Sequence, residues 1–425
     1  MLIQRDIQEH IRPWLQRPEI TAILGPRQVG KTSLIGLLKN ELREYHTVYL
    51  DLEDTFNLRL CENVDTFLHF LSGQGWEKGK KVFCFIDEIQ YLPDPSKFLK
   101  LVHDHHQDIK LIITGSSSFD IRRKFRESLA GRKITFHLLP LSFSEYLRFK
   151  NSEFSQLKQS CRLKDIIEQP GLAEKFHIYT EKVLPLFEDF LVFGGFPRIA
   201  LESESSLRKR LLQELFNTYV LKDIKDLAKI ANVLKFNKLV TYLAVQTANL
   251  FRFDEAAKEL GIAHKTLEHH LFLLENTFIL SLIRPFVGNI QKELTKMPKL
   301  FFLDNGLRNA LINDFRDPAL RTDAGLLAEN ACFAELLKQQ SWIEEIRYWR
   351  SADGKEIDFI IILEDKTHVP VEVKYKNYVR LEMPTSMNYF IKRYNAPVAI
   401  VFTKSTFATR RVRETLLLFL PLWML

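Results

Sequence analysis

One octapeptide near the start of this 425-residue chain limits its fold more than any other feature. Residues 25–32 read Gly-Pro-Arg-Gln-Val-Gly-Lys-Thr; the apolar run 20–24 before them predicts a strand, and the apolar spacing in 31–45 predicts a helix. A G-x-x-x-x-G-K-T loop between a strand and a helix curls its backbone N–H groups around phosphate oxygens. We therefore expect a nucleotide-phosphate site built from Gly25, Pro26, Arg27, Gln28, Val29, Gly30, Lys31, Thr32 and Ser33.

Two acidic residues after another apolar run complete the chemistry that this loop implies. The run 82–86 is followed directly by Asp87 and Glu88. At the carboxyl end of a central strand, Asp87 can hold the Mg²⁺ that the Thr32 hydroxyl also ligates, while Lys31 reaches the β- and γ-phosphates. Glu88 is then the base that polarises an attacking water. The acid pair favours hydrolysis of ATP with Mg²⁺, and kinase-like transfer to an acceptor is the weaker alternative.

A third apolar run, 111–114, ends in a polar cluster at 114–118. This is where a residue that senses the nucleotide would lie, between the loop and the acid pair. We predict Ser116 in this role and Thr114 as the second choice. A plain turn at the end of the strand is the alternative.

A basic stretch follows, with Arg122, Arg123, Lys124 and Arg126 and then Gly131-Arg132-Lys133. Arg132 lies after a glycine turn and before the predicted strand 134–138, so it is the candidate arginine finger. It would act on the nucleotide of a neighbouring subunit, which requires a homo-oligomer. Contact with a phosphate backbone and a solvated charged face are the alternatives.

Strands and helices alternate through the first part of the chain. Strands are predicted at 20–24, 47–52, 82–86 and 111–114, and helices at 4–17, 31–45, 64–72 and 95–106. Strands that are apolar almost throughout and alternate with helices are typical of a parallel sheet covered on both faces. We therefore predict an α/β fold class, with a first domain over 1–150.

The middle of the chain has a helix-turn-helix-like pattern. Helices are predicted at 254–260 and 264–276, separated by Gly261, and an apolar strand follows at 278–283. The basic residues here are few: Lys258 and Lys265, with histidines at 264, 269 and 270. A helix that reads DNA usually carries several Arg or Lys contacts, so subunit packing is an equal alternative to DNA binding.

The motifs GPRQVGKT, FIDEIQ, ITGSSS and LAGR, with residues 139–146, together resemble a family of bacterial and archaeal AAA+-type ATPases. In that family the C-terminal part is a domain of unknown function with a nuclease-like fold, and no biological role is agreed. The resemblance covers essentially the whole chain. It implies a P-loop AAA+-type ATPase core at 1–150, a helical lid or linker at 151–235, a winged-helix-like domain at 236–310 and a restriction-endonuclease-like α/β domain of the PD-(D/E)xK type at 311–425.

Acidic residues of the C-terminal region follow an order similar to the D…ExK core of such nucleases. Glu329 lies on the predicted helix 325–340, Asp358 lies on a strand, and Glu372 and Lys374 share one face of the next strand. Metal-dependent phosphodiester hydrolysis needs two carboxylates that bind Mg²⁺ and a lysine that polarises water. An active nuclease, a nuclease-like fold without activity and a surface charge pattern are the three interpretations.

The net charge of +7, from 60 basic and 53 acidic residues, is a local property of the same region. Residues 374–413 hold nine basic residues and one acidic residue, with tyrosines between them. This composition predicts a phosphate-binding face for DNA beside the acidic residues, or a surface for an acidic protein partner.

Several absences point to a cytoplasmic protein with no membrane association. The 4 cysteines have no metal-ligand spacing, charges appear at once after the N-terminus, and the longest apolar run, 415–425, is too short for a bilayer. We therefore expect an ATPase coupled to a C-terminal domain that binds or cleaves DNA. The alternative is a nucleotide-switched regulatory or scaffold ATPase whose inactive nuclease-like domain binds a protein partner.

Overall fold

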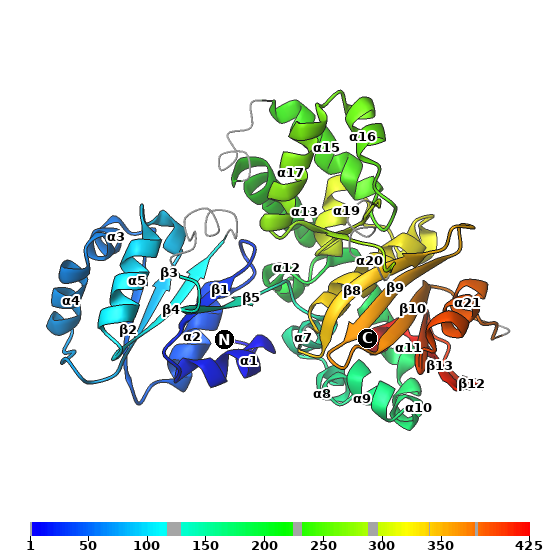
Figure 1. Ribbon diagram of the computed structural model, residues 1–425, viewed down its shortest axis with the longest axis horizontal. Helices are drawn as coiled ribbons and strands as arrows, with labels where there is room; N and C mark the ends of the chain where they lie inside the picture. The colour runs from blue at the N-terminus through cyan, green and yellow to red at the C-terminus, as the bar shows by residue number, and fades with distance from the viewer. Residues whose placement is uncertain (1, 117–128, 224–231, 288–295, 340, 379–380) are drawn as a thin grey trace. The chain divides into compact units, whose positions relative to one another are not determined.

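The computed structural model describes residues 2–116, 129–223, 232–287, 296–339, 341–378 and 381–425 (Figure 1). The chain divides into two compact units. Unit 1 comprises Met1–Pro140 and Asn276–Phe278, and unit 2 comprises Leu141–Glu275 and Ile279–Leu425. No helix within the described ranges is both long enough and apolar enough to cross a bilayer.

Unit 1 is built on a five-stranded sheet. Its strands are β1 (Ile20–Leu24), β2 (His46–Asp51), β3 (Val82–Asp87), β4 (Ile109–Gly115) and β5 (Lys133–His137). Its helices are α1 (Ile7–Leu15), α2 (Lys31–Glu41), α3 (Thr55–Glu62), α4 (Val64–Gly73) and α5 (Pro95–His105). The strand order is β2-β3-β4-β1-β5 and the neighbouring strands pair in parallel. The carboxyl ends of β1, β3 and β4 therefore meet at one edge of the sheet.

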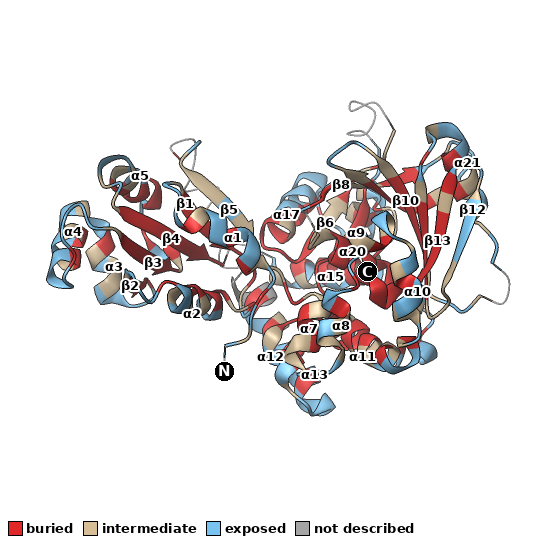
Figure 2. Cartoon of the chain, turned by 90° about the horizontal axis from the view of Figure 1, so that it is seen from below, coloured by how far each residue is buried: buried red, intermediate tan, exposed pale blue. Residues whose placement is uncertain are grey.

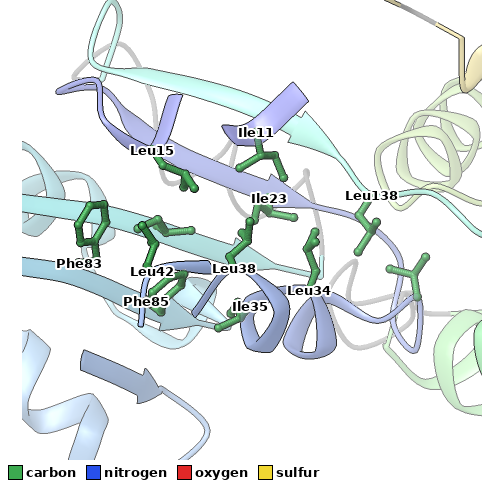
Figure 3. Close-up of a cluster of buried hydrophobic side chains, with 12 residues drawn as sticks. Ile11, Leu15, Ile23, Leu34, Ile35, Leu38, Leu42, Phe83, Phe85 and Leu138 are labelled. Carbon is green, nitrogen blue, oxygen red and sulfur yellow. The ribbon is translucent and has the colours of Figure 1, made fainter. Parts of the chain in front are cut away.

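The core of unit 1 forms where α1 and α2 pack on the sheet. Ile11, Ile23, Leu34, Leu38 and Phe85 belong to one buried cluster that joins these helices to β1 and β3 (Figure 3). Full burial of such side chains contributes about 1.5–3 kcal/mol each. The predicted parallel α/β sheet of the N-terminal region is confirmed, strand by strand.

Unit 2 begins with helices and ends in a mixed sheet. Its helices are α7 (Phe143–Phe149), α8 (Phe154–Gln159), α9 (Leu163–Glu168), α10 (Gly171–His177), α11 (Thr180–Phe193), α12 (Pro197–Leu201), α13 (Ser205–Leu215), α15 (Val233–Val245), α16 (Phe253–Leu260), α17 (His264–Asn276), α19 (Asn305–Ile312), α20 (Ala324–Leu337) and α21 (Thr385–Tyr394). Its strands are β6 (Leu280–Ile283), β7 (Lys299–Phe302), β8 (Ile343–Arg350), β9 (Glu356–Leu363), β10 (His368–Lys374), β11 (Val398–Thr403), β12 (Ala408–Val412) and β13 (Thr415–Pro421).

The larger sheet of unit 2 has the strand order β12-β13-β11-β10-β9-β8. Strands β10, β11 and β13 pair in parallel, and the remaining pairs are antiparallel. Helix α21 contributes Met387 and Phe390 to a buried cluster with the strands, whereas Phe333 of α20 stacks against Phe301 of β7 with ring centroids 4.6 Å apart. The C-terminal region is therefore α/β, as predicted, with its sheet mixed rather than parallel.

The predicted helix pair in the middle of the chain is also present. Helix α16 is capped at its C-terminus by Gly261, which has φ 59° in the left-handed region that favours glycine, and α17 begins three residues later. Strands β6 and β7 pair in an antiparallel two-stranded sheet after α17.

Candidate nucleotide site and acidic C-terminal site

Two glycines shape the loop at the carboxyl end of β1. Gly30 has φ 95°, and its carbonyl accepts the first helical hydrogen bond of α2 from the N–H of Leu34 at 2.9 Å. A Cβ at Gly25 would lie 2.1 Å from the carbonyl oxygen of Leu138, so a side chain there would force the backbone apart. The predicted loop residues 25–33 thus lead from β1 into the N-terminus of α2, where backbone N–H groups are free of helical partners.

Arg5 anchors this loop from a distant part of the sequence. Its guanidinium is buried and donates to the carbonyl of Val29 at 2.9 Å and to the carbonyl of Leu139 at 2.7 Å. The loop and the segment that follows β5 are therefore tied to the same side chain. Sequence analysis missed Arg5, because nothing in its local pattern marks a contact 24 residues away.

The Lys31 side chain is buried with little opposite charge around it. Its Nζ lies 3.3 Å from the Gly25 carbonyl oxygen, 3.2 Å from the Pro26 carbonyl oxygen and 3.5 Å from Glu88 Oε1. Burial lowers the pKa of Lys31, and the negative charges of Glu88 and Asp87 raise it by less. An ammonium whose charge is only partly neutralised is well placed to attract phosphate oxygens.

The carboxylate of Asp87 accepts three hydroxyl hydrogen bonds. Thr32 Oγ1 donates to Oδ2 at 2.7 Å, Tyr49 donates to the same oxygen at 3.1 Å, and Thr114 donates to Oδ1. Burial, and then the charge of Asp87, raise the pKa of Tyr49, so its hydroxyl keeps its proton. Thr32 and Asp87 are hard oxygen ligands that lie together beside the loop. Mg²⁺ takes such ligands alongside phosphates and waters, so these residues fit the predicted ion.

Glu88 leaves β3 in an unusual backbone conformation. Its φ of 55° is in the left-handed region, and its N–H donates to Thr114 Oγ1 at 3.1 Å. The amide of Gln90 donates to the Glu88 carboxylate and, at 3.0 Å, to Ser116 Oγ. Thr114 therefore contacts the Asp87 carboxylate and the Glu88 backbone directly, whereas among the described residues Ser116, our first choice as the sensor, is linked to Glu88 through Gln90.

Arg132 lies at the opposite end of the sheet from the phosphate loop. Its carbonyl accepts from the N–H of Ile20, at the start of β1, and its Nε donates to Asp104 Oδ1 at 2.7 Å. It therefore does not contact the loop of its own unit, and a role on a neighbouring subunit stays a prediction. The basic residues Arg122, Arg123, Lys124 and Arg126 lie outside the described residues.

The four residues of the second predicted site come together in unit 2. Asp358 Oδ2, on β9, accepts from the N–H of Val373, on β10, at 2.8 Å. Glu372 Oε1 and Lys374 Nζ, also on β10, form an ion pair at 2.7 Å. Burial, and then the charge of Asp358, raise the pKa of both Glu329, on α20, and Glu372. These side chains thus form one electrostatic group.

A residue that sequence analysis missed lies between these acids. Lys299 Nζ, at the start of β7, lies 2.6 Å from Glu356 Oε1, 3.0 Å from Glu329 Oε1 and 3.6 Å from Asp358 Oδ1. Burial lowers the pKa of Lys299, but the three carboxylates raise it by more, so the ammonium stays charged. We call Lys299, Glu329, Glu356 and Asp358 the Lys299 cluster.

A divalent metal ion does not fit this arrangement. The Lys299 ammonium lies against the Glu329 and Asp358 oxygens that would ligate it, and the described residues contain no group of three or more His, Cys, Asp or Glu side chains that could hold a metal. One observation favours an additional ligand, because Glu372 Oε2 is buried and has no hydrogen-bond partner among the described residues. Cleavage by two carboxylates needs the metal between them, so no hydrolytic step follows from this geometry.

Two basic residues of the C-terminal region, Arg410 and Arg411, lie on a different part of the sheet from the acidic ones, whereas Lys374 pairs with Glu372. Arg410 and Arg411 are exposed on the edge strand β12 (Figure 2), which β13 and β11 separate from β10. Three strand spacings amount to about 14 Å, so these two arginines do not lie beside the acids. Two of the tyrosines have partners within the protein, because Tyr375 donates to Glu188 and the ring of Tyr394 packs on Phe390 at 4.4 Å, whereas Tyr389 is exposed.

Comparison with known families covers most of both units. Residues 17–147 match the family described as an AAA domain. The N-terminal region is thus similar to AAA domains over the whole of its sheet. Residues 184–317 and 324–425 match two families described as domains of unknown function, DUF8612 and DUF4143. These descriptions name no activity for unit 2, and a nuclease identity is not among them.

Curated relatives extend the similarity to nearly the whole chain. A protein of Methanocaldococcus jannaschii is 25% identical over 377 residues, which cover 87% of this chain and 77% of the relative. A Haemophilus influenzae protein is 25% identical over 352 residues, covering 80% and 79%, and a Mycobacterium tuberculosis protein is 24% identical over 371 residues, covering 87% and 73%. All three are named as uncharacterized proteins, so the similarity names no function.

Solved structures give only weak alignments. C. elegans PCH-2 aligns with a TM-score of 0.25 and 17% identity, over 38% of this chain and 44% of that chain. Drosophila ORC bound to DNA aligns with a TM-score of 0.29 and 13% identity, over 69% of this chain and 91% of that chain. At these TM-scores the alignments support no conclusion about this chain.

Proposed function

We propose that the AAA-type domain binds ATP with Mg²⁺ and hydrolyses it. The observation that carries this proposal is the meeting of the two sequence motifs at one edge of the sheet. Lys31 Nζ lies 3.5 Å from Glu88 Oε1, and Thr32 Oγ1 lies 2.7 Å from Asp87 Oδ2. The groups that bind phosphate, hold the metal ion and activate water are therefore within reach of one γ-phosphate.

Each of these side chains has a separate task in the proposed reaction. Lys31 attracts the β- and γ-phosphate oxygens, and Thr32 and Asp87 hold Mg²⁺, which supplies positive charge to the phosphates when bound. Glu88 accepts a proton from water as the water oxygen bonds to the γ-phosphorus. The bond from that phosphorus to the β–γ bridging oxygen breaks, which releases ADP and phosphate. Thr114 orients both acids through its single hydroxyl.

Phosphate release from ATP by the full chain tests this proposal. We expect Glu88→Gln to lower the turnover rate by about 100-fold or more while a fluorescent ATP analogue still binds, since only the base is lost. Glu77→Gln is a matched control, because Glu77 is an exposed acid of the same unit, paired with Lys80. Full turnover in the Glu88→Gln variant would contradict the assignment of the base.

We further propose that unit 2 binds a nucleic-acid backbone through β12, without cleaving it. Arg410 and Arg411 are exposed on this edge strand, and neither forms an ion pair within the described part of the chain. Exposed arginines without acidic partners gain contacts with phosphates at little desolvation cost. Cleavage is not part of this proposal, because the Lys299 ammonium lies against the Glu329 and Asp358 oxygens that would ligate the metal ion. An acidic protein partner for the same edge is the alternative.

Binding of a labelled DNA duplex to the full chain, at two salt concentrations and with or without ATP, tests the second proposal. We expect Arg410→Glu with Arg411→Glu to weaken binding by at least about tenfold and to reduce its salt dependence. Lys164→Glu with Lys175→Glu is the matched control, because both lysines are exposed in unit 2 and the charge change is the same. Equal weakening in the two double variants would contradict a specific role for β12.

A further inference from the structure

The strand that begins with Lys299, β7, is tied to α20 by Asn330, the residue that follows Glu329. Asn330 Oδ1 accepts from the N–H of Phe302 at 2.7 Å, and Asn330 Nδ2 donates to the Phe302 carbonyl at 3.0 Å. This pair of hydrogen bonds sets the register of β7 against α20. Lys299, at the other end of β7, is therefore fixed beside Glu329 rather than resting there as a flexible surface lysine.

The carboxylates around Lys299 come from separate elements. Glu356 and Asp358 are on β9 and Glu329 is on α20, and the Lys299 side chain is only 3% exposed. An ammonium group has three N–H donors, and three carboxylate groups lie within 2.6–3.6 Å of it. Burial of so many like charges together is costly unless a cation lies among them.

We propose that the ammonium group of Lys299 is the resident cation of this carboxylate cluster, in place of a divalent metal ion. It follows that unit 2 folds and binds its partner without a metal at this site. It also follows that a neutral side chain at position 299 turns the cluster into a divalent-cation site. This inference concerns unit 2 alone and does not depend on the proposed ATP hydrolysis in unit 1.

The oxygens that a metal would need are already present once the ammonium is removed. Lys299 uses Glu329 Oε1 and Asp358 Oδ1, and both become available in its absence. Within the described ranges Glu372 Oε2 is buried without a partner, and burial and then the charge of Asp358 raise the pKa of Glu372. Carboxylate oxygens from two strands and a helix are a donor set that suits Mn²⁺ or Mg²⁺.

Titration of the full chain with Mn²⁺ alone, without nucleotide, tests the proposal, with free Mn²⁺ counted by electron paramagnetic resonance. We expect Lys299→Met to bind one more Mn²⁺ than the wild type. The dissociation constant of this new site should be at least about tenfold lower than that of any Mn²⁺ site in unit 2 of the wild type. Adding Asp358→Asn to Lys299→Met should abolish the gain. Lys299→Arg, which keeps a cation at this position, is the matched control and should gain no Mn²⁺ site.

Two results would overturn the proposal. The first is a folded Lys299→Met variant that gains no Mn²⁺ site. The second is a wild-type chain that loses Mn²⁺ binding on Asp358→Asn, because that loss means the native cluster already holds a metal. The comparison of wild type with Asp358→Asn needs no substitution at Lys299, so it decides the native occupant even when Lys299→Met fails to fold.

Discussion

Lys31 of the phosphate loop and Lys299 of the acidic cluster are both buried lysines near carboxylates, with side chains 5% and 3% exposed. Their charges are balanced in different ways. Lys31 contacts two backbone carbonyls and one carboxylate at 3.5 Å, and burial lowers its pKa. Lys299 contacts three carboxylates, which raise its pKa despite burial.

This difference separates a lysine that awaits a ligand from one whose charge is already neutralised. A buried ammonium without enough opposite charge gains stability when an anion arrives, so Lys31 is suited to bind phosphate. An ammonium surrounded by carboxylates gains nothing from an anion and supports the fold instead. Loss of Lys299 should therefore lower stability, whereas loss of Lys31 should lower nucleotide affinity, which makes the comparison testable.

The largest expected effect is on stability, in the Lys299→Ala variant. Removing this lysine leaves three carboxylates without their cation, so we expect the free energy of unfolding to fall by about 3–5 kcal/mol. Chemical denaturation followed by tryptophan fluorescence measures it, because Trp342, Trp349 and Trp423 lie in unit 2. Lys31→Ala is the control and should change stability without nucleotide by less than about 1 kcal/mol. Equal losses in both variants would remove the distinction between the two lysines.

A smaller effect is expected on turnover, at the end of β4. Thr114→Val removes the hydroxyl that contacts Asp87 and Glu88, and we expect ATP hydrolysis to slow by about tenfold. Ser116→Ala is the matched variant and should slow it by less than about threefold, since Ser116 acts only through Gln90. A larger loss for Ser116→Ala than for Thr114→Val would restore Ser116 as the sensor.

The smallest effect concerns pH. Burial, and then the charge of Asp358, raise the pKa of Glu372 to about 7 from its ordinary value of 4.5. Between these values the folded chain holds a proton that the unfolded chain has lost, so this carboxyl makes folding less favourable as pH rises toward 7. Glu372→Gln should remove that slope, a change on the order of 1 kcal/mol between pH 5 and pH 7. Denaturation of both chains at several pH values measures it, and parallel pH profiles would contradict the assignment.

Contiguous patterns made most of unit 1 predictable from sequence. The strands 20–24 and 82–86 and the loop between them follow from apolar runs and glycines that are neighbours in the chain. Helix α3 was missed because Cys61 is its one buried residue, so its apolar spacing carries no helical period. The sequence could not decide whether Thr114 or Ser116 is the nucleotide-sensing residue. That depends on which of the two side chains faces Asp87, and the pairing of β4 with its neighbouring strands determines this orientation.

The C-terminal site was predictable only in part, for a physical reason. The order of Glu329, Asp358 and Glu372 along the chain indicated that they would meet, and they do. Lys299 opens a short apolar strand, where a lysine usually reaches solvent, and its burial depends on the packing of β7 against α20. Likewise, the chain order of the basic residues does not show that β12 is an edge strand several positions away from β10.

Nucleotide binding by two matched variants tests the central comparison most directly. Lys31→Met and Lys299→Met each replace a buried ammonium by an apolar side chain of similar length, and a fluorescent ATP analogue with Mg²⁺ measures affinity in the full chain. We predict that Lys31→Met weakens binding by at least about 100-fold and that Lys299→Met leaves it within about threefold of the wild type. Wild-type affinity in Lys31→Met, or an equal loss in both variants, would contradict the account.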